Sequence, residues 1–333
     1  MKLLALRLFF LAVVAVVAAV AGAWWYATRP LPLARPVIDF TVARGFTMRQ
    51  AAAAIAAAGV DVNPRLLYWI ARVSGKADRI LAGSYEVHAG VTPWLLILKL
   101  SSGDVSQAEL RLVEGWNFRQ VRAALEANPH LMQDTAGLTD AEILQRVGAT
   151  ETHPEGLFFP DTYLFDKQSS AIAVLGRAYR AMHQRLSQVW EGRAAGLPLA
   201  SPYEALILAS IVEKETGRPE DRGLIASVFI NRLRAGMRLQ TDPAVIYGQG
   251  SAFDGNLRKR DLETDHAYNT YTRVGLPPTP IAMPGLDALN AAVKPAASDY
   301  LYFVSRGDGT SAFSTNLADH NRAVNQYQRG AGS

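Results

Sequence analysis

Apolar residues are densest near the N-terminus, where Leu8 to Ala27 form an uncharged run of 20 residues, LFFLAVVAVVAAVAGAWWYA. A helix of that length is roughly 30 Å long, which matches the hydrocarbon thickness of a bilayer. The run ends in three successive aromatic residues, as a span does at a membrane interface. Lys2 and Arg7 precede it, and basic flanks favour the cytoplasmic side. The pattern predicts a cytoplasmic N-terminus over residues 1–7 and a transmembrane anchor over residues 8–27.

A cleaved signal peptide is the alternative interpretation of this run. Ala21-Gly22-Ala23 resembles a small-x-small cleavage site. The run is longer than a usual signal core and continues through the Trp pair, which favours an uncleaved anchor. Both interpretations place the rest of the chain outside the cytoplasm.

Alternating and helical patterns after the anchor predict a small α+β module over residues 38–105. Three prolines in residues 28–37 are typical of a semi-rigid linker. Ile38 to Val42 alternates like a strand, and Thr47-x-x-Gln50 is a capping box that opens an Ala-rich helix. The module is completed by helices over 64–73 and 92–100 and a strand over 83–87, in β-α-α-β order. Residues 106–153 form a connecting α+β segment, with another capped helix opened by Thr139-x-x-Glu142.

Residues 154–329 predict a larger α+β domain. Ser201-Pro202-x-Glu204 combines three helix-start signals, and the helix that it opens ends near Gly217. Other helices are expected over 171–190, 221–235 and 317–328, and a strand pair over 300–304 and 312–315. The stretch between Gly236 and Gly285 is rich in Gly, Pro, Asn and Tyr, which is typical of loops.

Composition narrows the possible chemistry. Hydrophobic residues make up 49% and charged residues 19%, which excludes a disordered chain. The net charge is only +4 and no basic run carries interleaved aromatics, so we expect no nucleic-acid partner. Cysteine is absent, which excludes disulfides, thiolate metal sites and cysteine nucleophiles. The six histidines show no metal-ligand spacing, and we expect neither a metal nor a cofactor.

One helix carries a candidate acid. On a helical wheel, Ile207, Leu208, Ile211 and Val212 share one face, and Glu215 falls within about 10° of its centre. Glu213 points about 160° away, as a solvated or structurally paired carboxylate would. A carboxyl group on an apolar face has a raised pKa, which suits a general acid at neutral pH. The alternative is that Glu215 emerges from the core and pairs with a cation such as Arg218.

Several longer motifs in residues 156–321 resemble the endolytic murein transglycosylase family (MltG/YceG-like). They are GLFFPDTYLF, ASIVEKET, SVFINRLRAGMRLQTDPAVIYG, DLETDHAYNTYTRVGLPPTPIAMPG, YLYFV and FSTNLADHN. The resemblance implies a LysM-like module over residues 38–105 and a catalytic transglycosylase domain over residues 154–329, built around a central Glu-bearing helix. It also implies internal cleavage of peptidoglycan glycan strands between N-acetylmuramic acid and N-acetylglucosamine, with 1,6-anhydro-muramic acid ends, and termination of nascent glycan polymerisation.

The resemblance also assigns residues. The second Glu of the EKET motif, Glu215, is the expected catalytic acid, and Glu215-Thr216 resembles the Glu-Ser pair of other lytic transglycosylases. A single carboxyl group suffices, because the C6 hydroxyl of the sugar is the nucleophile. The residues expected around the cleft are Asn231, Gln240, Thr241, Tyr268, Asn269 and Tyr271.

Location and partners follow from the anchor and the resemblance together. We expect a single-pass inner-membrane protein with a periplasmic catalytic domain, acting on glycan strands beside peptidoglycan synthases. Two other functions remain open. One is a lysozyme-like hydrolase in which Glu215 is the acid and an Asp such as Asp242 helps a water molecule. The other is a membrane-anchored scaffold that binds peptidoglycan without cleaving it.

Overall fold

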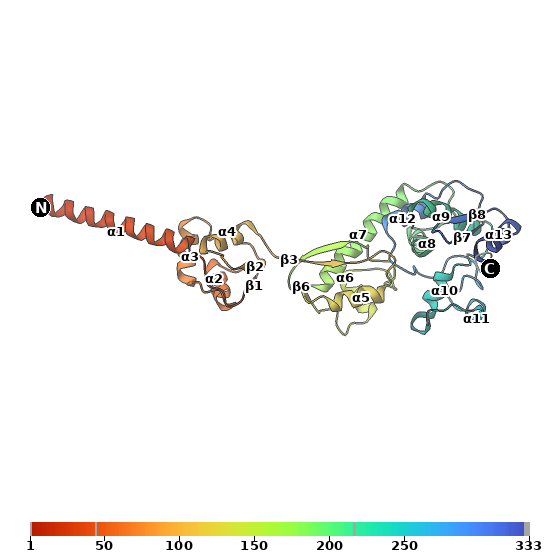
Figure 1. Ribbon diagram of the computed structural model, residues 1–333, viewed down its shortest axis with the longest axis horizontal. Coiled ribbons are helices and arrows are strands. Elements are labelled where there is room, and N and C mark those ends of the chain that lie inside the picture. The colour runs from red at the N-terminus through yellow and green to blue at the C-terminus, as the bar shows by residue number, and fades with distance from the viewer. Residues whose placement is uncertain (1, 44, 216–217, 330–333) are drawn as a thin grey trace. The chain divides into compact units, whose positions relative to one another are not determined.

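The computed structural model describes residues 2–43, 45–215 and 218–329, and the chain is of mixed α+β class as expected (Figure 1). It divides into two compact units. Unit 1 contains the chain up to Ala108 together with Leu164–Ser169. Unit 2 contains Glu109–Tyr163 and the chain from Ser170 onward. The predicted domain boundaries stay predictions.

The N-terminal apolar run forms one long helix, α1 (Lys2–Thr28). Residues Leu6–Thr28 are long and apolar enough to cross a membrane, and none of the most apolar stretch is buried inside the protein. The helix continues through the Trp pair as expected. A signal sequence would have the same properties, so the cleaved alternative is not decided by this helix.

The predicted β-α-α-β order is present in the rest of unit 1. The elements are β1 (Val37–Val42), α2 (Met48–Ala57), α3 (Pro64–Val73), β2 (Gly83–His88) and α4 (Pro93–Ser102). β1 and β2 are antiparallel, with Phe40 opposite Tyr85. Alternate residues of β1 are buried, because successive side chains point to opposite faces of a sheet. The helices cover the buried face with side chains such as Ile55, Leu67 and Leu96. The likeness of this unit to LysM stays a prediction.

Capping residues set the starts of several helices as the sequence indicates. Thr47 and Gln50 form the predicted capping box of α2, and Thr139 and Glu142 form that of α6 (Asp140–Val147). A third box, with Asn117 as its N-cap, starts α5 (Phe118–Ala127). Each box satisfies backbone N–H groups that would otherwise lack partners at the helix start.

The chain passes between the units three times, within β3 (Gln107–Arg111), within β5 (Thr162–Asp166) and after Ser169, and β3 and β5 pair with each other. β4 (Leu131–Met132) pairs with β6 (Ser169–Ser170). Next to β5, the Lys167 ammonium group lies 2.6 Å from the Asp39 carboxylate and 2.9 Å from the Glu86 carboxylate. These ion pairs fix Leu164–Ser169 to β1 and β2 within unit 1.

Helices dominate unit 2. Its principal layer contains α7 (Ala171–Glu191), α8 (Pro202–Glu215), α9 (Pro219–Arg234) and α12 (Leu286–Val293). The remaining elements are α10 (Asp242–Gln249), a 3-10 turn η1 (Gly250–Ala252), α11 (Lys259–Glu263), the hairpin β7 (Tyr302–Ser305) and β8 (Ser311–Ser314), α13 (Leu317–Val324) and a π-helical turn η2 (Asn325–Arg329). α8 packs against α7, α9, α10 and α12, and every residue from Ala205 to Val212 is buried. The helix that bears Glu215 is therefore held by packing against its neighbours.

Candidate active site

Glu215 is the last residue of α8 and opens into a cleft of about 890 Å³. Its Oε1 atom accepts a hydrogen bond of 2.5 Å from the Thr241 hydroxyl. Burial raises the pKa of the Glu215 carboxyl to about 7; the Thr241 hydrogen bond opposes this shift, while the nearby charge of Asp242 adds to it. Near neutral pH the group therefore exchanges a proton readily, as a general acid–base must.

Thr241 is held so that its hydroxyl reaches Glu215. The residue is 1% exposed, and it precedes α10 as the N-cap residue without capping that helix through its side chain. Its N–H donates to the Thr270 hydroxyl at 3.0 Å, and that hydroxyl donates back to the Thr241 carbonyl at 3.2 Å. The preceding Gln240 has a φ of +50°, a strained conformation for a residue with a side chain. The strained turn and the bonds to Thr270 together orient the Thr241 hydroxyl toward the Glu215 carboxyl.

The cleft collects side chains from segments far apart in the sequence. It lies within unit 2, between the end of α8, α9, the start of α10, the β7–β8 hairpin and α13. Its wall includes Glu215, Arg218, Arg232, Gln240, Asp242, Tyr271, Tyr302, Ser305, Thr310, His320, Asn321 and Gln328. Aromatic rings beside hydroxyl, amide and charged groups suit a sugar, which offers both apolar faces and hydroxyls.

Arg232 places a nearly buried positive charge in this wall. Its guanidinium donates to the carbonyls of Leu301 at 2.6 Å and Leu239 at 2.7 Å, and it lies 5.1 Å from the centre of the Tyr302 ring. Its charge acts against the burial that raises the pKa of Glu215. Arg232 therefore connects the hairpin and the Gln240 turn, and it favours the carboxylate form that follows proton donation.

Asp242 and Tyr271 form a second polar pair in the cleft. The Tyr271 hydroxyl donates to the Asp242 Oδ1 atom at 2.5 Å. Burial raises the pKa of Tyr271, and the hydrogen bond to Asp242 raises it further. The bond keeps the tyrosine protonated and occupies one oxygen of Asp242.

The position of Glu213 differs in part from the helical-wheel prediction. Its side chain is only 7% exposed, so the solvated alternative is wrong and the paired one is confirmed. Its Oε2 atom accepts from the Gly285 N–H at 2.9 Å, and its Oε1 atom lies 3.7 Å from the Arg222 guanidinium. The wheel assumes that one side of the helix faces solvent, whereas α8 is buried all round. Glu213 links α8 to α9 and to the start of α12.

Of the expected cleft residues, Thr241 does not line the cleft itself but bonds Glu215, and three others lie away from it. The Asn231 amide donates to the carbonyls of Ser298 at 2.8 Å and Tyr300 at 3.0 Å. The Tyr268 hydroxyl bonds with that of Thr279 at 2.8 Å, and the Tyr268 ring packs on Tyr247. These contacts support the chain around the cleft.

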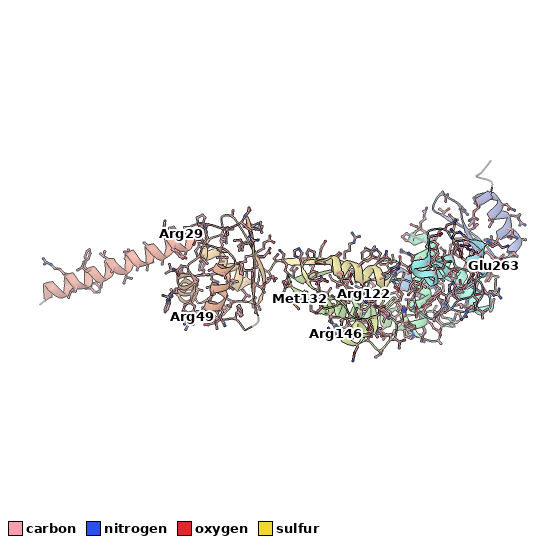
Figure 2. All side chains as sticks on the ribbon, turned by 90° about the horizontal axis from the view of Figure 1, so that it is seen from below. Arg29, Arg49, Arg122, Met132, Arg146 and Glu263 are labelled. Carbon is pink, nitrogen blue, oxygen red and sulfur yellow. The ribbon has the colours of Figure 1, made fainter. Side chains whose placement is uncertain are left out.

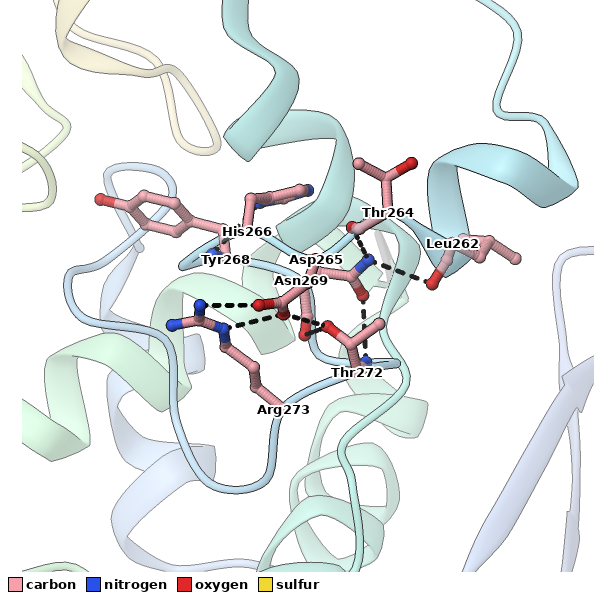
Figure 3. A network of polar contacts seen from close by, with 8 residues as sticks. All are labelled: Leu262, Thr264, Asp265, His266, Tyr268, Asn269, Thr272 and Arg273. Carbon is pink, nitrogen blue, oxygen red and sulfur yellow. Dashed lines mark hydrogen bonds and ion pairs between the residues drawn. The ribbon is translucent and has the colours of Figure 1, made fainter.

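Asn269 is the third of these residues, and it is fully buried. Figure 3 shows it within a network of polar contacts. Its amide nitrogen donates to the carbonyls of Asp261, Leu262 and Thr264, and its oxygen accepts from the N–H groups of Tyr271 and Thr272. Around Asn269 in the same loop, Asp265 pairs with Arg273 and accepts from the Thr272 hydroxyl. Asn269 thus shapes the loop that presents Tyr271.

The structure brings Gln240, Thr241 and Tyr271 to Glu215, and it adds residues that sequence reasoning did not select. Arg232, Tyr302, His320 and Asn321 belong to or adjoin motifs that carried the family resemblance, which was their only signal. Thr216, expected to form a Glu-Ser-like pair with Glu215, lies outside the described residues. Among the described residues no group of three or more side chains could hold a metal ion.

Comparison with known proteins identifies relatives of this chain. The model of the YceG-like family matches residues 40–326. An endolytic murein transglycosylase of Bacillus subtilis is 33% identical over 268 residues, which are 75% of this chain and 74% of the relative. One of Streptococcus pneumoniae is 27% identical over 320 residues, 86% of this chain and 57% of the relative.

A solved structure adds the fold. The crystal structure of a yceG-like protein from Listeria monocytogenes superposes with a TM-score of 0.55 at 29% identity, covering 86% of this chain and 98% of that one. The family model alone spans most of the chain. The chain belongs to the YceG-like family.

Proposed function

We infer that the protein is an endolytic murein transglycosylase, a lyase that acts on peptidoglycan. Relatives of that name match most of the chain, and the family model covers both units. The observation that supports it best is Glu215, a carboxyl group with a pKa of about 7 in a cleft large enough for sugar rings.

We propose that Glu215 performs both proton transfers. Protonated Glu215 donates to the glycosidic oxygen as the bond to C1 of the muramic acid breaks through an oxocarbenium-like state. The resulting carboxylate then takes the proton of the C6 hydroxyl while that oxygen attacks C1, which leaves a 1,6-anhydro end and returns Glu215 to its acid form. The Thr241 hydroxyl stabilises the carboxylate between the two steps.

The other residues position the glycan in this proposal. Tyr271 and Tyr302 offer aromatic groups, and Gln240 and Asn321 offer amides, within the same cleft. Asp242 is engaged by the Tyr271 hydroxyl, so it is not needed to activate a water molecule. The lysozyme-like reaction is therefore the less favoured one.

The setting of the reaction is also part of the proposal. α1 anchors the chain once in the membrane, and Lys2 and Arg7 favour a cytoplasmic N-terminus with both units in the periplasm. Unit 1 acts as a LysM-like module that holds glycan, and synthases in the same inner membrane supply nascent strands, whose polymerisation the cleavage terminates.

Product analysis tests the reaction. The full chain in detergent is incubated with uncross-linked glycan strands, and the products are separated by length and weighed by mass spectrometry. We expect internal fragments that end in anhydro-muramic acid, which weigh one water less than reducing ends. Reducing ends would indicate hydrolysis, and unchanged strands would indicate a binding scaffold.

A further inference from the structure

Helix α3 carries two apolar stripes. Leu67 and Ala71 are buried in the core of unit 1. Leu66, Trp69 and Val73 lie three and four positions apart and are 45%, 59% and 86% exposed. Residues at that spacing share one face of a helix, and the core already occupies another face. An exposed apolar stripe with a Trp at its centre is typical of a contact surface.

The exposed stripe faces the end of α1. Leu66, Trp69, Ile70 and Val73 line a groove of about 750 Å³ whose other wall is formed by residues of α1 from Ala19 to Thr28, with Trp94 beside it. The Asn63 N–H, at the start of α3, donates to the Tyr26 hydroxyl at 3.0 Å. This bond and the burial of Ala27 hold the end of α1 against α3.

The position of the groove along α1 indicates what fills it. The span Leu6–Thr28 has 23 residues. A helix of that length is about 34 Å long, little more than a bilayer core of about 30 Å. Ala19 lies about 20 Å from Leu6 along the helix, so the part of α1 that lines the groove is about the last two-fifths of the span. Figure 2 shows the side chains of α1 standing clear of the rest of unit 1 until the helix nears Arg29.

Charged and aromatic groups lie near the same end of the α1 span. The Arg29 guanidinium lies 5.2 Å from the Trp25 ring centre and 4.8 Å from that of Tyr26. Arg65 is exposed on α3 beside the apolar stripe, and Arg72, also exposed there, pairs with Asp78 at 2.9 Å. Trp, Tyr and Arg gather where lipid head groups meet acyl chains, and exposed cations there favour phosphate.

We propose that the exposed stripe of α3, together with Trp94 and the half-exposed Leu95, inserts into the lipid interface of the membrane that α1 spans. Phospholipid fills the groove, and α3 lies in the interface as an amphipathic helix does. Unit 1 thereby gains a second membrane contact, which fixes its orientation on the surface rather than leaving it tethered by one helix. The proposal rests on α1 spanning the membrane.

Spin labelling of the full chain tests this contact, because the chain has no cysteine and a single substitution gives a unique label. Val73→Cys reports the stripe. Val274→Cys is the matched control, a valine 66% exposed in unit 2. Val16→Cys reports the span itself. Each labelled protein is placed, one chain per disc, in nanodiscs of phosphatidylcholine and phosphatidylglycerol, and collisions with oxygen and with a water-soluble nickel chelate are measured.

The proposal expects an oxygen-to-nickel collision ratio at position 73 several-fold above that at position 274 and approaching that at position 16. A lipid-like ratio at position 16 with a water-like ratio at position 73 would overturn the lipid contact and leave the anchor intact. A water-like ratio at position 16 would overturn the anchor and with it the proposal. The same ratio is also measured in vesicles that hold many chains. A lipid-like ratio at position 73 in those vesicles but not in single-chain nanodiscs would indicate that a second copy fills the groove, and would equally overturn the proposal.

Discussion

At the scale of single residues, Glu213 and Glu215 show how surroundings divide roles between identical side chains. Burial raises the pKa of both carboxyls. The Glu213 carboxylate accepts from the Gly285 N–H and lies beside the Arg222 guanidinium, where α8 packs against α9 and α12. Glu215 bonds the Thr241 hydroxyl and opens into the cleft. Only Glu215 can reach a ligand.

Replacing each glutamate with glutamine separates these roles. Glu215→Gln keeps the shape but cannot transfer a proton, so turnover should fall by about 10²- to 10⁴-fold with folding unchanged. Glu213→Gln should retain most activity per folded molecule while losing about 1–3 kcal/mol of unfolding free energy, because it weakens a buried charged hydrogen bond. Anhydro-end formation and urea unfolding measure the two effects. An active Glu215→Gln protein would remove this residue from the mechanism.

The pH dependence of activity belongs to the same residue. The general acid must be protonated, so kcat/KM should fall as the pH rises above about 7, the pKa of Glu215. The Thr241 hydrogen bond lowers that pKa, so Thr241→Val should shift the alkaline limb upward by about one pH unit, as about 1.4 kcal/mol of lost hydrogen bonding would. A limb that stays in place would mean that another group controls it.

Stability should follow the same titration. The folded pKa of Glu215 lies above its ordinary value of 4.5, so the folded state binds more protons between these values. Stability contributed by this group is complete below about pH 4.5 and is lost as the pH rises through about 7. The unfolding free energy of the native chain minus that of Glu215→Gln should therefore fall between pH 5 and pH 8. The subtraction removes the effect of Glu155, another buried carboxyl with a pKa of about 7.

At the scale of elements, the sequence predicts where helices start and their hydrophobic periodicity better than it predicts what packs around them. The Thr47 and Thr139 capping boxes are local, because all their contacts lie within four residues, and both form. The two faces assigned to α8 depend on what packs around it, and four other helices bury it on all sides. Asn269 and Tyr271 illustrate the same limit within one loop. Their residue types suit sugar binding equally well, yet one lies buried at the centre of the loop and the other lines the cleft.

Substituting these two loop residues tests that difference. Asn269→Ala would leave three carbonyls and two N–H groups without their side-chain partner, so it should destabilise unit 2 by about 3 kcal/mol or more. Its activity should fall in step with its melting temperature. Tyr271→Phe removes only the hydroxyl bonded to Asp242, so it should melt near the native temperature and lose activity through a raised KM. A stable but inactive Asn269→Ala protein would instead place Asn269 among the glycan contacts.

At the scale of the whole molecule, the sequence predicts the order of anchor, small unit and large unit, because each has its own hydrophobic pattern. It does not predict that Leu164–Ser169 returns to unit 1 after the chain has left that unit at Ala108. That return depends on Lys167 meeting Asp39 and Glu86, a pairing that no local pattern encodes. The chain crosses between the units three times, within β3, within β5 and after Ser169, so more than a single linker joins them.

The return of Leu164–Ser169 to unit 1 decides how the role of unit 1 should be tested. Deleting residues 38–105 removes Asp39 and Glu86 and leaves Lys167 without its ion-pair partners, so the deletion should be combined with Lys167→Ser. If unit 1 holds glycan, the shortened protein should keep its kcat on short soluble fragments and lose activity on long strands, where a second contact supplies effective concentration. The native chain carrying Lys167→Ser alone is the control for the altered β5 end. Equal loss on both substrates would mean that unit 1 supports folding instead, and equal activity on both would assign it to spacing the cleft from the membrane.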